Sequence, residues 1–464
     1  MAGRVRLKDI KWPQFGLPEE MPRIAASEYE ERLGEARAKM AERGLTHLVV
    51  YADREHSANM AYLTGFDPRF EEALLVLGRR GKPIILVGNE GLGYIPISPV
   101  KLEVELFQSF SLPGQDRSKS RKLSSILSGC GIGRASKVGT VGWKYFGGEE
   151  IEAPDLCLEI PSYMADTLRE LTGVRERVVN ATGIFQNPSD GLRLINSADQ
   201  IALFEFAATR TSEGMKRLIW GLKPGMREYE VVRFYQADGL PLSCHLIASS
   251  GEKAKKMGLS SPSDNIIRLG DPFITGFGLW GALNARAGFV AASEADLPKK
   301  QKRFIEDFAA PYFSAVCRWY EAIGIGVRAG DVVKAVMKSI PKSRWDLALN
   351  PGHYIHLDEW VSSPFYPGSK IRLRSGMAFQ VDIIPVSKGP FYLANMEDGI
   401  VLADRKLRDE VSQKHPDCWG RIQKRRDFMM GTIGINLKPE ILPLCNIPGI
   451  YAPFFLSPEK VFVR

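Results

Sequence analysis

The sequence contains no long hydrophobic run and no closely spaced cysteines, and both absences exclude classes of protein. No stretch of about 18 uncharged apolar residues occurs, so no segment is expected to span a membrane. Segment 1–22 has basic residues with no apolar run behind them, so no secretory signal is predicted. The six cysteines form no Cys-x-x-Cys pair, which argues against a zinc knuckle and suits reduced thiols. A cytoplasmic location is therefore expected.

Motifs of several enzyme classes are also missing. The chain has neither a Gly-x-Ser-x-Gly nucleophile turn nor a glycine-rich loop ending in Gly-Lys-Ser/Thr. The run Gly129-Cys-Gly131-Ile-Gly133 is more typical of a turn than of a cofactor loop. Serine-nucleophile, P-loop and dinucleotide-binding functions thus find no support.

The composition is that of a globular protein. The chain has 464 residues, 44% of them hydrophobic and 25% charged, which predicts two domains. The net charge is +8, with basic clusters at 117–122 and 424–426. Such clusters could attract nucleic acid or an acidic substrate, but no stacking-aromatic motif accompanies them. We therefore expect solvated loops and helix faces, and no nucleic-acid partner.

Residues 28–187 have the pattern of an α/β domain. We expect a helix over 29–43 that ends at Gly44, strands at 45–51 and 137–142, and a hairpin formed by 73–77 and 83–87.

A cluster of turn-forming residues at 187–191 predicts a domain boundary, followed by a second domain over 192–464. An amphipathic helix is expected at 197–221. Further expected elements are β-runs at 242–249, 272–277, 377–384 and 399–402, and helices at 297–323 and 328–339. This order suits two αβ halves around a shared curved sheet.

Short motifs lie along the chain in an order typical of one enzyme family. They are Asn-Met-Ala-Tyr-Leu-Thr-Gly-Phe at 59–66, Leu-Lys-Pro-Gly-Met at 222–226, Ala-Ser-Ser-Gly-Glu at 248–252, Leu-Gly-Asp at 269–271, Pro-Gly-His at 351–353, Ser-Gly-Met-Ala-Phe at 375–379 and Met-Glu-Asp at 396–398. Together they resemble the creatinase/aminopeptidase P family, the segment 59–66 resembling a strand–turn of that family's N-terminal domain. The resemblance implies an α/β (α+β) fold, with a creatinase-like N-terminal domain and a pita-bread C-terminal domain. It also implies a homodimer.

The family resemblance further implies a C–N bond hydrolase that in most members holds two metal ions. Their ligands are two aspartates, one histidine and two glutamates. By position, the aspartates would fall at Gly276 and near Asn284 or Ala285, and none of these residues is acidic. Two further family histidines would fall at Gly258 and Trp360.

The remaining family ligand positions are occupied by His353, Asp382 and Glu397. Two divalent ions would leave about two uncompensated charges in this site, so a dinuclear centre is not expected. Two alternatives stay open: a hydrogen-bonded polar cluster without metal, or one divalent ion held by His353, Asp382 and Glu397. The expectation is no cofactor, or at most one metal ion.

The resemblance to creatinase suggests how such a site works without metal. Asp382 and Glu397 would bind a guanidinium or ammonium group through charge-assisted hydrogen bonds. A histidine would act as general acid or base, and the candidates are His353, His356 and His245. On a strand His356 would point away from His353, so it could instead be a packed or exposed residue.

Two further residues are candidates for substrate binding. Arg286 stands beside the position of the second aspartate, and its cation could take the place of the metal and pair with Asp382 or Glu397. Trp280, like Trp360, is expected to fill space left by absent ligands.

Two functions follow from these observations. The first is a non-standard hydrolase acting on a small amine, a guanidine or a short peptide. The second is a non-catalytic pseudo-peptidase that binds a peptide or a small cationic ligand. The retained carboxylates and histidine favour the first, and the missing ligands favour the second.

Overall fold

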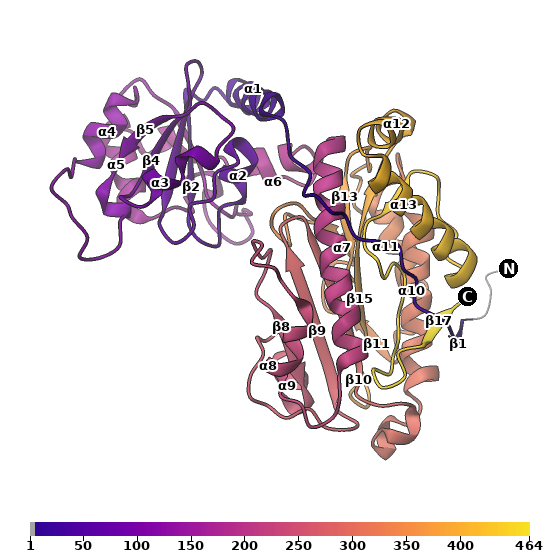
Figure 1. Ribbon diagram of the computed structural model, residues 1–464. Coiled ribbons are helices and arrows are strands. Elements are labelled where there is room, and N and C mark those ends of the chain that lie inside the picture. The colour runs from indigo at the N-terminus through magenta and orange to yellow at the C-terminus, as the bar shows by residue number, and fades with distance from the viewer. Residues whose placement is uncertain (1–4) are drawn as a thin grey trace. The chain divides into compact units, whose positions relative to one another are not determined.

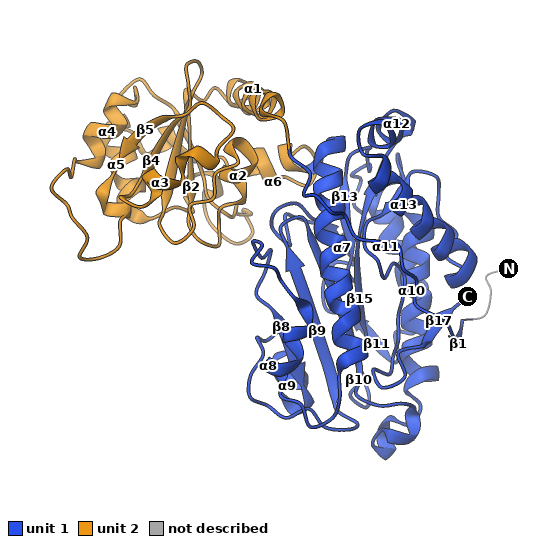
Figure 2. Cartoon of the chain, viewed as in Figure 1, with its two compact units in different colours: residues 1–23, 194–464 blue, residues 24–193 orange. Residues whose placement is uncertain are grey.

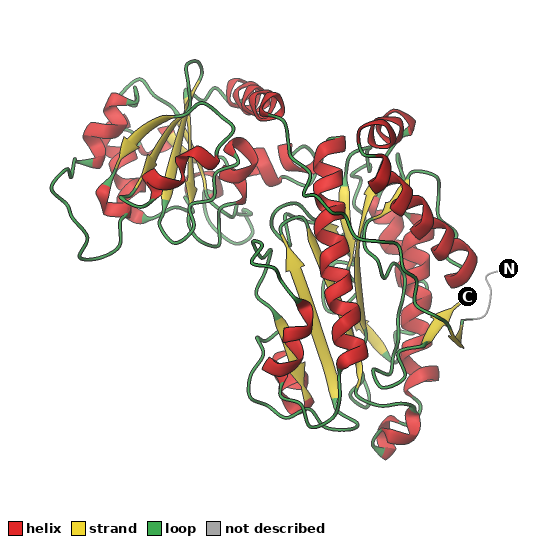
Figure 3. Cartoon of the chain, viewed as in Figure 1, coloured by secondary structure: helices red, strands yellow, loops and turns green. Residues whose placement is uncertain are grey.

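The chain divides into two compact units in a computed structural model that describes residues 5–464. One unit comprises residues 24–193 and the other comprises 194–464 together with the N-terminal segment up to Arg23 (Figure 2). The division falls between Arg193 and Leu194, a few residues beyond the turn cluster 187–191. Both units mix helices and strands (Figure 3).

Unit 24–193 is built on a six-stranded mixed sheet with the strand order β5-β4-β3-β2-β6-β7 (Figure 1). The strands are β2 (His47–Ala52), β3 (Ala73–Gly78), β4 (Ile84–Val87), β5 (Glu103–Leu106), β6 (Val138–Val141) and β7 (Val178–Asn180). The predicted hairpin is present, because β3 and β4 pair antiparallel. The predicted strands at 45–51 and 137–142 correspond to β2 and β6.

Alternating side chains give this sheet two apolar faces. Val50 and Leu75 belong to a core shared with helices α1 and α2, whereas Val49 and Leu74 belong to a core shared with α4 and α5. The helices of this unit are α1 (Ala26–Glu42), α2 (Ala58–Thr64), α3 (Gly91–Tyr94), α4 (Leu123–Gly129), α5 (Ser162–Thr172) and α6 (Gly183–Gln186).

The expectation of a strand–turn at 59–66 was wrong. Residues Ala58–Thr64 form helix α2, which ends at Gly65 in the left-handed conformation with φ 68°. All seven helix residues are buried. Because no polar face interrupts the segment, its sequence carries no 3.6-residue period by which a helix could be recognised.

The larger unit contains a seven-stranded sheet with the order β12-β13-β15-β10-β9-β8, in which β16 also pairs with β15. Its strands are β8 (Ile247–Ser250), β9 (Pro272–Leu279), β10 (Ala282–Phe289), β12 (His353–Tyr354), β13 (Ala378–Val381), β15 (Asn395–Leu402) and β16 (Ile441–Pro443). A separate ribbon joins β11 (Trp345–Leu347) to β14 (Pro385–Ser387).

Helices cover one face of this sheet. The long helix α7 (Ala198–Gly221) was predicted at 197–221, and it packs against β9 and β10. Its Thr211 hydroxyl donates to Asn284 Oδ1 of β10 at 2.8 Å, which places Asn284 on the helix-covered face. The other helices of the unit are α8 (Glu228–Val231), α9 (Gly251–Met257), α10 (Ala310–Ala322), α11 (Ala329–Met337), α12 (Arg405–Lys414) and α13 (Pro416–Phe428).

Both ends of the chain belong to the larger unit. Strand β1 (Arg6–Asp9) pairs antiparallel with β17 (Lys460–Val463), and the Trp12 indole N–H donates to the Pro458 carbonyl at 2.8 Å. Segment 5–23 lies outside both expected domains, 28–187 and 192–464, whereas the apolar segment 441–455 falls within the second. Among the described helices, none is long and apolar enough to cross a membrane.

Candidate active site

A cavity of about 540 Å³ lies against the sheet of the larger unit. Much of its wall is apolar and includes Leu259, Leu349, Ile384, Phe391 and Leu393. Three carboxylates also line it, those of Glu359, Asp382 and Glu397. Among the described residues of this lining there is no lysine or arginine. The cavity is therefore acidic and large enough for a small organic molecule.

Strand register brings two of these carboxylates to the same face of the sheet. Glu397 lies in β15, and Asp382 directly follows β13. Val381 pairs with Asp398, so Asp382 is the next residue opposite Glu397. Side chains alternate along a strand, and Asp398 consequently points to the opposite, helix-covered face.

His353 is held next to these carboxylates by the backbone around it. Gly352 has φ 110°, and a Cβ there would lie 2.7 Å from the Gln380 carbonyl oxygen, so only glycine fits without displacement. The His353 Nδ1 atom lies 3.1 Å from the Tyr354 carbonyl oxygen. A carbonyl oxygen only accepts hydrogen bonds, so we assign the proton to Nδ1.

The other ring nitrogen of His353 faces two carboxylates. Nε2 lies 3.2 Å from Glu359 Oε1 and 3.3 Å from Glu397 Oε1. The Trp360 ring stacks on the imidazole with centroids 4.2 Å apart. His353 is wholly buried and is not itself part of the cavity lining, whereas Glu359, Trp360 and Glu397 are. His353 therefore contacts residues that line the cavity but does not line the cavity itself.

Burial raises the pKa of each carboxyl group in the cavity. Removal from water raises the pKa of Glu359 to about 7, with the charge of His353 opposing the shift. Burial also raises the pKa of Asp382, and it raises that of Glu397 well above the usual range, with the charge of Asp382 adding to the effect on Glu397. The group therefore retains protons at a pH at which surface carboxyls have lost them.

The three residues that could hold a single ion differ in one member from the predicted set. His353, Glu359 and Glu397 each offer one donor atom, and these atoms all lie within 4.8 Å of one another. Asp382, the expected third member, is not in that group and accepts a hydrogen bond from Asn395 Nδ2 at 3.1 Å. If the protein holds one divalent ion, Glu359 rather than Asp382 is placed to complete its ligands.

The positions of the family's two aspartates offer no donor to the cavity, because Asn284, one of the two alternatives for the second position, faces α7. Gly276 and Ala285 are directly paired between β9 and β10, and Ala285 is in turn paired with Glu397. A Cβ at Gly276 would lie 3.0 Å from Ile247 Cδ1, so an apolar side chain occupies that side of the strand.

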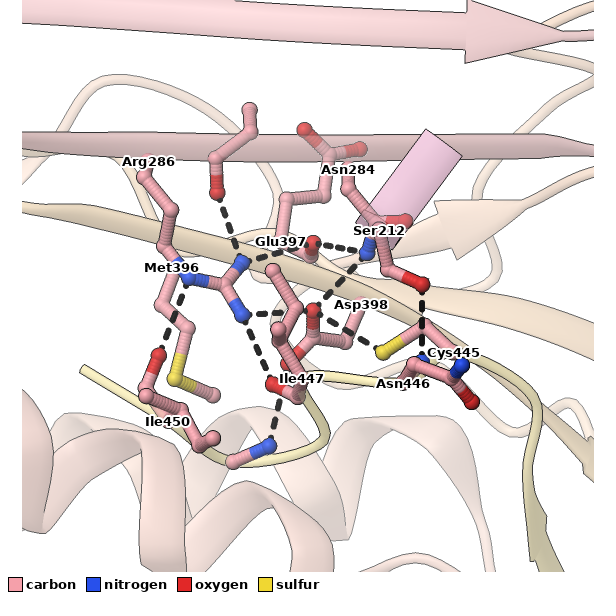
Figure 4. Close-up of polar contacts among 12 residues, drawn as sticks. Ser212, Asn284, Arg286, Met396, Glu397, Asp398, Cys445, Asn446, Ile447 and Ile450 are labelled. Atoms are coloured by element: carbon pink, nitrogen blue, oxygen red, sulfur yellow. Dashed lines mark hydrogen bonds and ion pairs between the residues drawn. The ribbon is translucent and has the colours of Figure 1, made fainter. Parts of the chain in front are cut away.

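Arg286 does not pair with Asp382 or Glu397 through their side chains, contrary to expectation. Its guanidinium forms an ion pair with Asp398 at 2.8 Å and donates to the carbonyl oxygens of Ile447 and Ile450 (Figure 4). The physical reason is the strand alternation: Arg286 and Asp398 project from the helix-covered face. Arg286 is accordingly absent from the cavity lining and binds the C-terminal segment to the sheet.

The remaining predicted residues have different surroundings. His245 lines the cavity, and its Nε2 donates to the Leu259 carbonyl at 2.8 Å. His356 is buried with its ring edge-on to Phe204 of α7, and it is not part of the lining. Trp280 lies in the turn between β9 and β10, also outside the lining. Of the three candidate histidines, His353 is the one placed within 3.3 Å of Glu359 and Glu397.

Sequence reasoning missed two residues of the cavity. The sequence favoured a surface or ion-paired position for Glu359 over a place in the pocket, and its position next to Trp360 was the available signal. Cys244 also lines the cavity, and burial raises its pKa well above the usual range, with the charges of Glu359 and Glu397 adding to the shift. No pattern in the sequence indicated Cys244.

The sequence matches no protein-family model and no curated protein. The structure, by contrast, is similar to several solved ones. A prolidase from Thermococcus sibiricus has a TM-score of 0.62 and 18% identity over 81% of this chain and 95% of that chain. A prolidase from Pyrococcus horikoshii OT3 has a TM-score of 0.61 and 15% identity, over 80% of this chain and 95% of the prolidase chain.

An X-Pro aminopeptidase from Thermotoga maritima MSB8 has a TM-score of 0.61 and 13% identity over 80% of this chain and 95% of that chain. At such identities the likeness concerns the fold. The architecture predicted from the motifs is thereby confirmed: the chain has the creatinase/aminopeptidase P-type fold, with a creatinase-like N-terminal domain and a pita-bread C-terminal domain.

Proposed function

We propose that this protein is a hydrolase of C–N bonds that acts on a small amine, a guanidine or a short peptide without the family's dinuclear metal centre. The observation that carries the proposal is the acidic cavity. Three carboxylates converge on it, no lysine or arginine stands among its described lining residues, and the remaining wall is largely apolar. Such a cavity complements a cation with an apolar body.

Asp382 and Glu397 are placed to hold the cationic group. Both are buried and face the cavity from neighbouring strands. Asn395 lies beside them in the lining and orients Asp382 through its amide. An ammonium or guanidinium group entering here would favour the ionised carboxylates, and would thus displace the protons that burial retains.

Glu359 is the residue that we assign to proton transfer. It faces the cavity, its pKa of about 7 suits a general acid and base, and it contacts His353 Nε2. In the ionised form Glu359 would take a proton from water as the water oxygen bonds to the carbon. The same proton would then pass to the nitrogen as the C–N bond breaks. His353 is a positioning residue whose charge opposes the rise that burial causes in the pKa of Glu359.

A single divalent ion is compatible with the residues present, whereas two ions are not. His353, Glu359 and Glu397 supply one nitrogen and two carboxylate donors, and Gly276 and Ala285 supply none. If one ion were bound there, Glu359 would serve as its ligand instead of as the proton-transfer group, and the ion would supply Lewis-acid chemistry to the same cavity.

The proposal is tested by screening amines, guanidines and dipeptides for thermal stabilisation, followed by measurement of product release. We expect Glu397→Gln to weaken binding about 10- to 100-fold, the loss typical of one charge-assisted hydrogen bond. Glu359→Gln should retain binding and lose turnover. Glu306→Gln, an exposed glutamate outside the cavity, serves as the control. Turnover that survives Glu359→Gln would contradict the assignment.

A second function is a non-catalytic pseudo-peptidase that binds a peptide or a small cationic ligand in the same cavity. Two observations favour it: His353 is shielded by Trp360 and lies outside the lining, and the two aspartate positions have no donor. Saturable ligand binding lost in Glu397→Gln, without turnover of any substrate class, would establish this function instead.

A further inference from the structure

Two carboxylates, those of Glu359 and Glu397, converge on one nitrogen of His353. Nδ1 is already engaged with the Tyr354 carbonyl, so only Nε2 faces Glu359 and Glu397. With its proton on Nδ1, the neutral ring directs the Nε2 lone pair at both carboxylates, and two ionised carboxylates have no hydrogen to donate to it. When both glutamates are ionised, the group carries two negative charges, which in a buried setting require a cation.

The distances also favour a shared cation over an imidazolium hydrogen bond. Charge-assisted N–H···O bonds are typically about 2.7–2.9 Å long. Two ligands each about 2.1 Å from one ion at a tetrahedral angle lie roughly 3.4 Å apart. The observed separations from His353 Nε2 are 3.2 Å to Glu359 and 3.3 Å to Glu397, closer to the second value.

We infer that Glu359 completes a site for one divalent cation together with His353 and Glu397. This inference rests on the cavity of the proposed function and adds a ligand at a position where the family's ligand segments have none. Glu359 follows His353 by six residues and comes from the loop after β12, whereas Gly276 and Ala285 contribute nothing. Glu359 thus supplies a carboxylate ligand that the residues at the two aspartate positions do not supply.

The rest of the geometry is that of a metal site. A metal-bound histidine usually donates its second ring N–H to a backbone carbonyl, as the Nδ1 of His353 does to Tyr354. Two ionised glutamates balance the charge of one divalent ion. One nitrogen and two oxygen donors suit zinc, manganese or iron(II). Because Glu359 and Glu397 line the cavity, an ion bound to them would remain open to a further ligand from the cavity.

Metal binding can be measured on the full chain without any substrate. After chelator treatment, the protein is titrated with ZnCl2 and MnCl2 by calorimetry, and with CoCl2 by visible absorption, which reports on ligand geometry. We expect about one ion per chain. Glu359→Gln should weaken binding at least about 100-fold, whereas the equally isosteric Asp382→Asn, which removes the carboxylate hydrogen-bonded to Asn395, should weaken it less than about 10-fold.

Folding of each variant is checked by circular dichroism in the presence of chelator. If Glu359→Gln does not fold, Glu359→Asp provides the same comparison, because its carboxylate is one methylene further from Nε2. The inference is overturned if no stoichiometric ion binds, or if Asp382→Asn is as damaging as Glu359→Gln. Turnover that persists in chelator would overturn the inferred metal site and leave the proposed hydrolase intact. One bound ion without turnover would support the metal site and contradict the proposed hydrolase.

Discussion

At the scale of single residues, Glu359 is the group whose environment departs most from expectation. Its carboxylate contacts the buried His353, which also contacts the buried Glu397, and 25% of the Glu359 side chain is exposed. Burial raises its pKa from the ordinary value of 4.5 to about 7. A carboxyl that retains its proton in the folded chain destabilises that chain once the pH is high enough to ionise it.

The sign of the resulting pH dependence can be predicted for the metal-free protein. Between about pH 4.5 and pH 7 the unfolded chain loses the Glu359 proton while the folded chain retains it, so this group's contribution to stability falls as the pH rises. Glu359→Gln cannot ionise. Relative to the parent, its free energy of unfolding should therefore increase by about 1–2 kcal/mol across this range.

Urea denaturation at pH 5 and pH 8 in chelator measures this difference. Glu252→Gln is the matched control: a hydrogen bond from Lys255 lowers the pKa of that exposed glutamate, so its contribution to stability should change little between pH 5 and pH 8. A Glu359→Gln difference that is unchanged between the two pH values would show that Glu359 ionises normally in the folded protein.

At the scale of elements, Arg286 connects strand β10 to the C-terminal segment. Its guanidinium is buried, pairs with Asp398 and donates to the carbonyls of Ile447 and Ile450. Gly449 N also donates to Asp398 Oδ2 at 3.1 Å. The segment after β16 is therefore bound to the sheet by polar contacts on the face opposite the cavity.

Arg286→Met should lower the free energy of unfolding by about 3–5 kcal/mol, because it leaves the Asp398 carboxylate buried without its cation. Chemical denaturation measures the change. Arg303→Met is the control: this arginine is 62% exposed, and its pairs with Glu306 and Asp307 should contribute less than about 1 kcal/mol. Adding Asp398→Asn to Arg286→Met should restore part of the loss. An Arg286→Met protein as stable as the parent would contradict this account.

At the scale of the whole molecule, the segment up to Arg23 completes the larger unit. Strand β1 supplies the partner of β17, Trp12 is buried against the end of the chain, and the Pro13 carbonyl accepts from Lys216 of α7 at 3.0 Å. Unit 24–193 has separate apolar cores on the two faces of its own sheet. The described segment 5–23 and the C-terminal strand β17 thus belong to the same unit.

Deletion of residues 1–23 should lower the unfolding midpoint of the larger unit by about 5–10 °C, since it removes the buried Trp12 side chain and leaves β17 unpaired. Scanning calorimetry measures the midpoint. Lys8→Ala alters an exposed side chain of β1 and should leave the midpoint within about 2 °C of the parent. A truncated chain that melts like the parent would show that β1 contributes little.

The sequence by itself determined the local elements and the order of the family motifs. Helix α7, the β3–β4 hairpin and the segments that carry His353, Asp382 and Glu397 were recognisable because each depends on periodicity or on a short motif. Features that depend on one short stretch of sequence could therefore be predicted from the sequence.

Only the tertiary structure decided which of these side chains meet. Glu359 joins His353 through a loop, Arg286 reaches Asp398 instead of Asp382, and both outcomes depend on strand register and on loop conformation. A one-residue difference in register moves a side chain to the other face of a sheet, and a sequence without an alignment does not specify register. The sequence therefore identified Asp382 and Glu397 as residues of the site, but it did not indicate that Glu359 joins them.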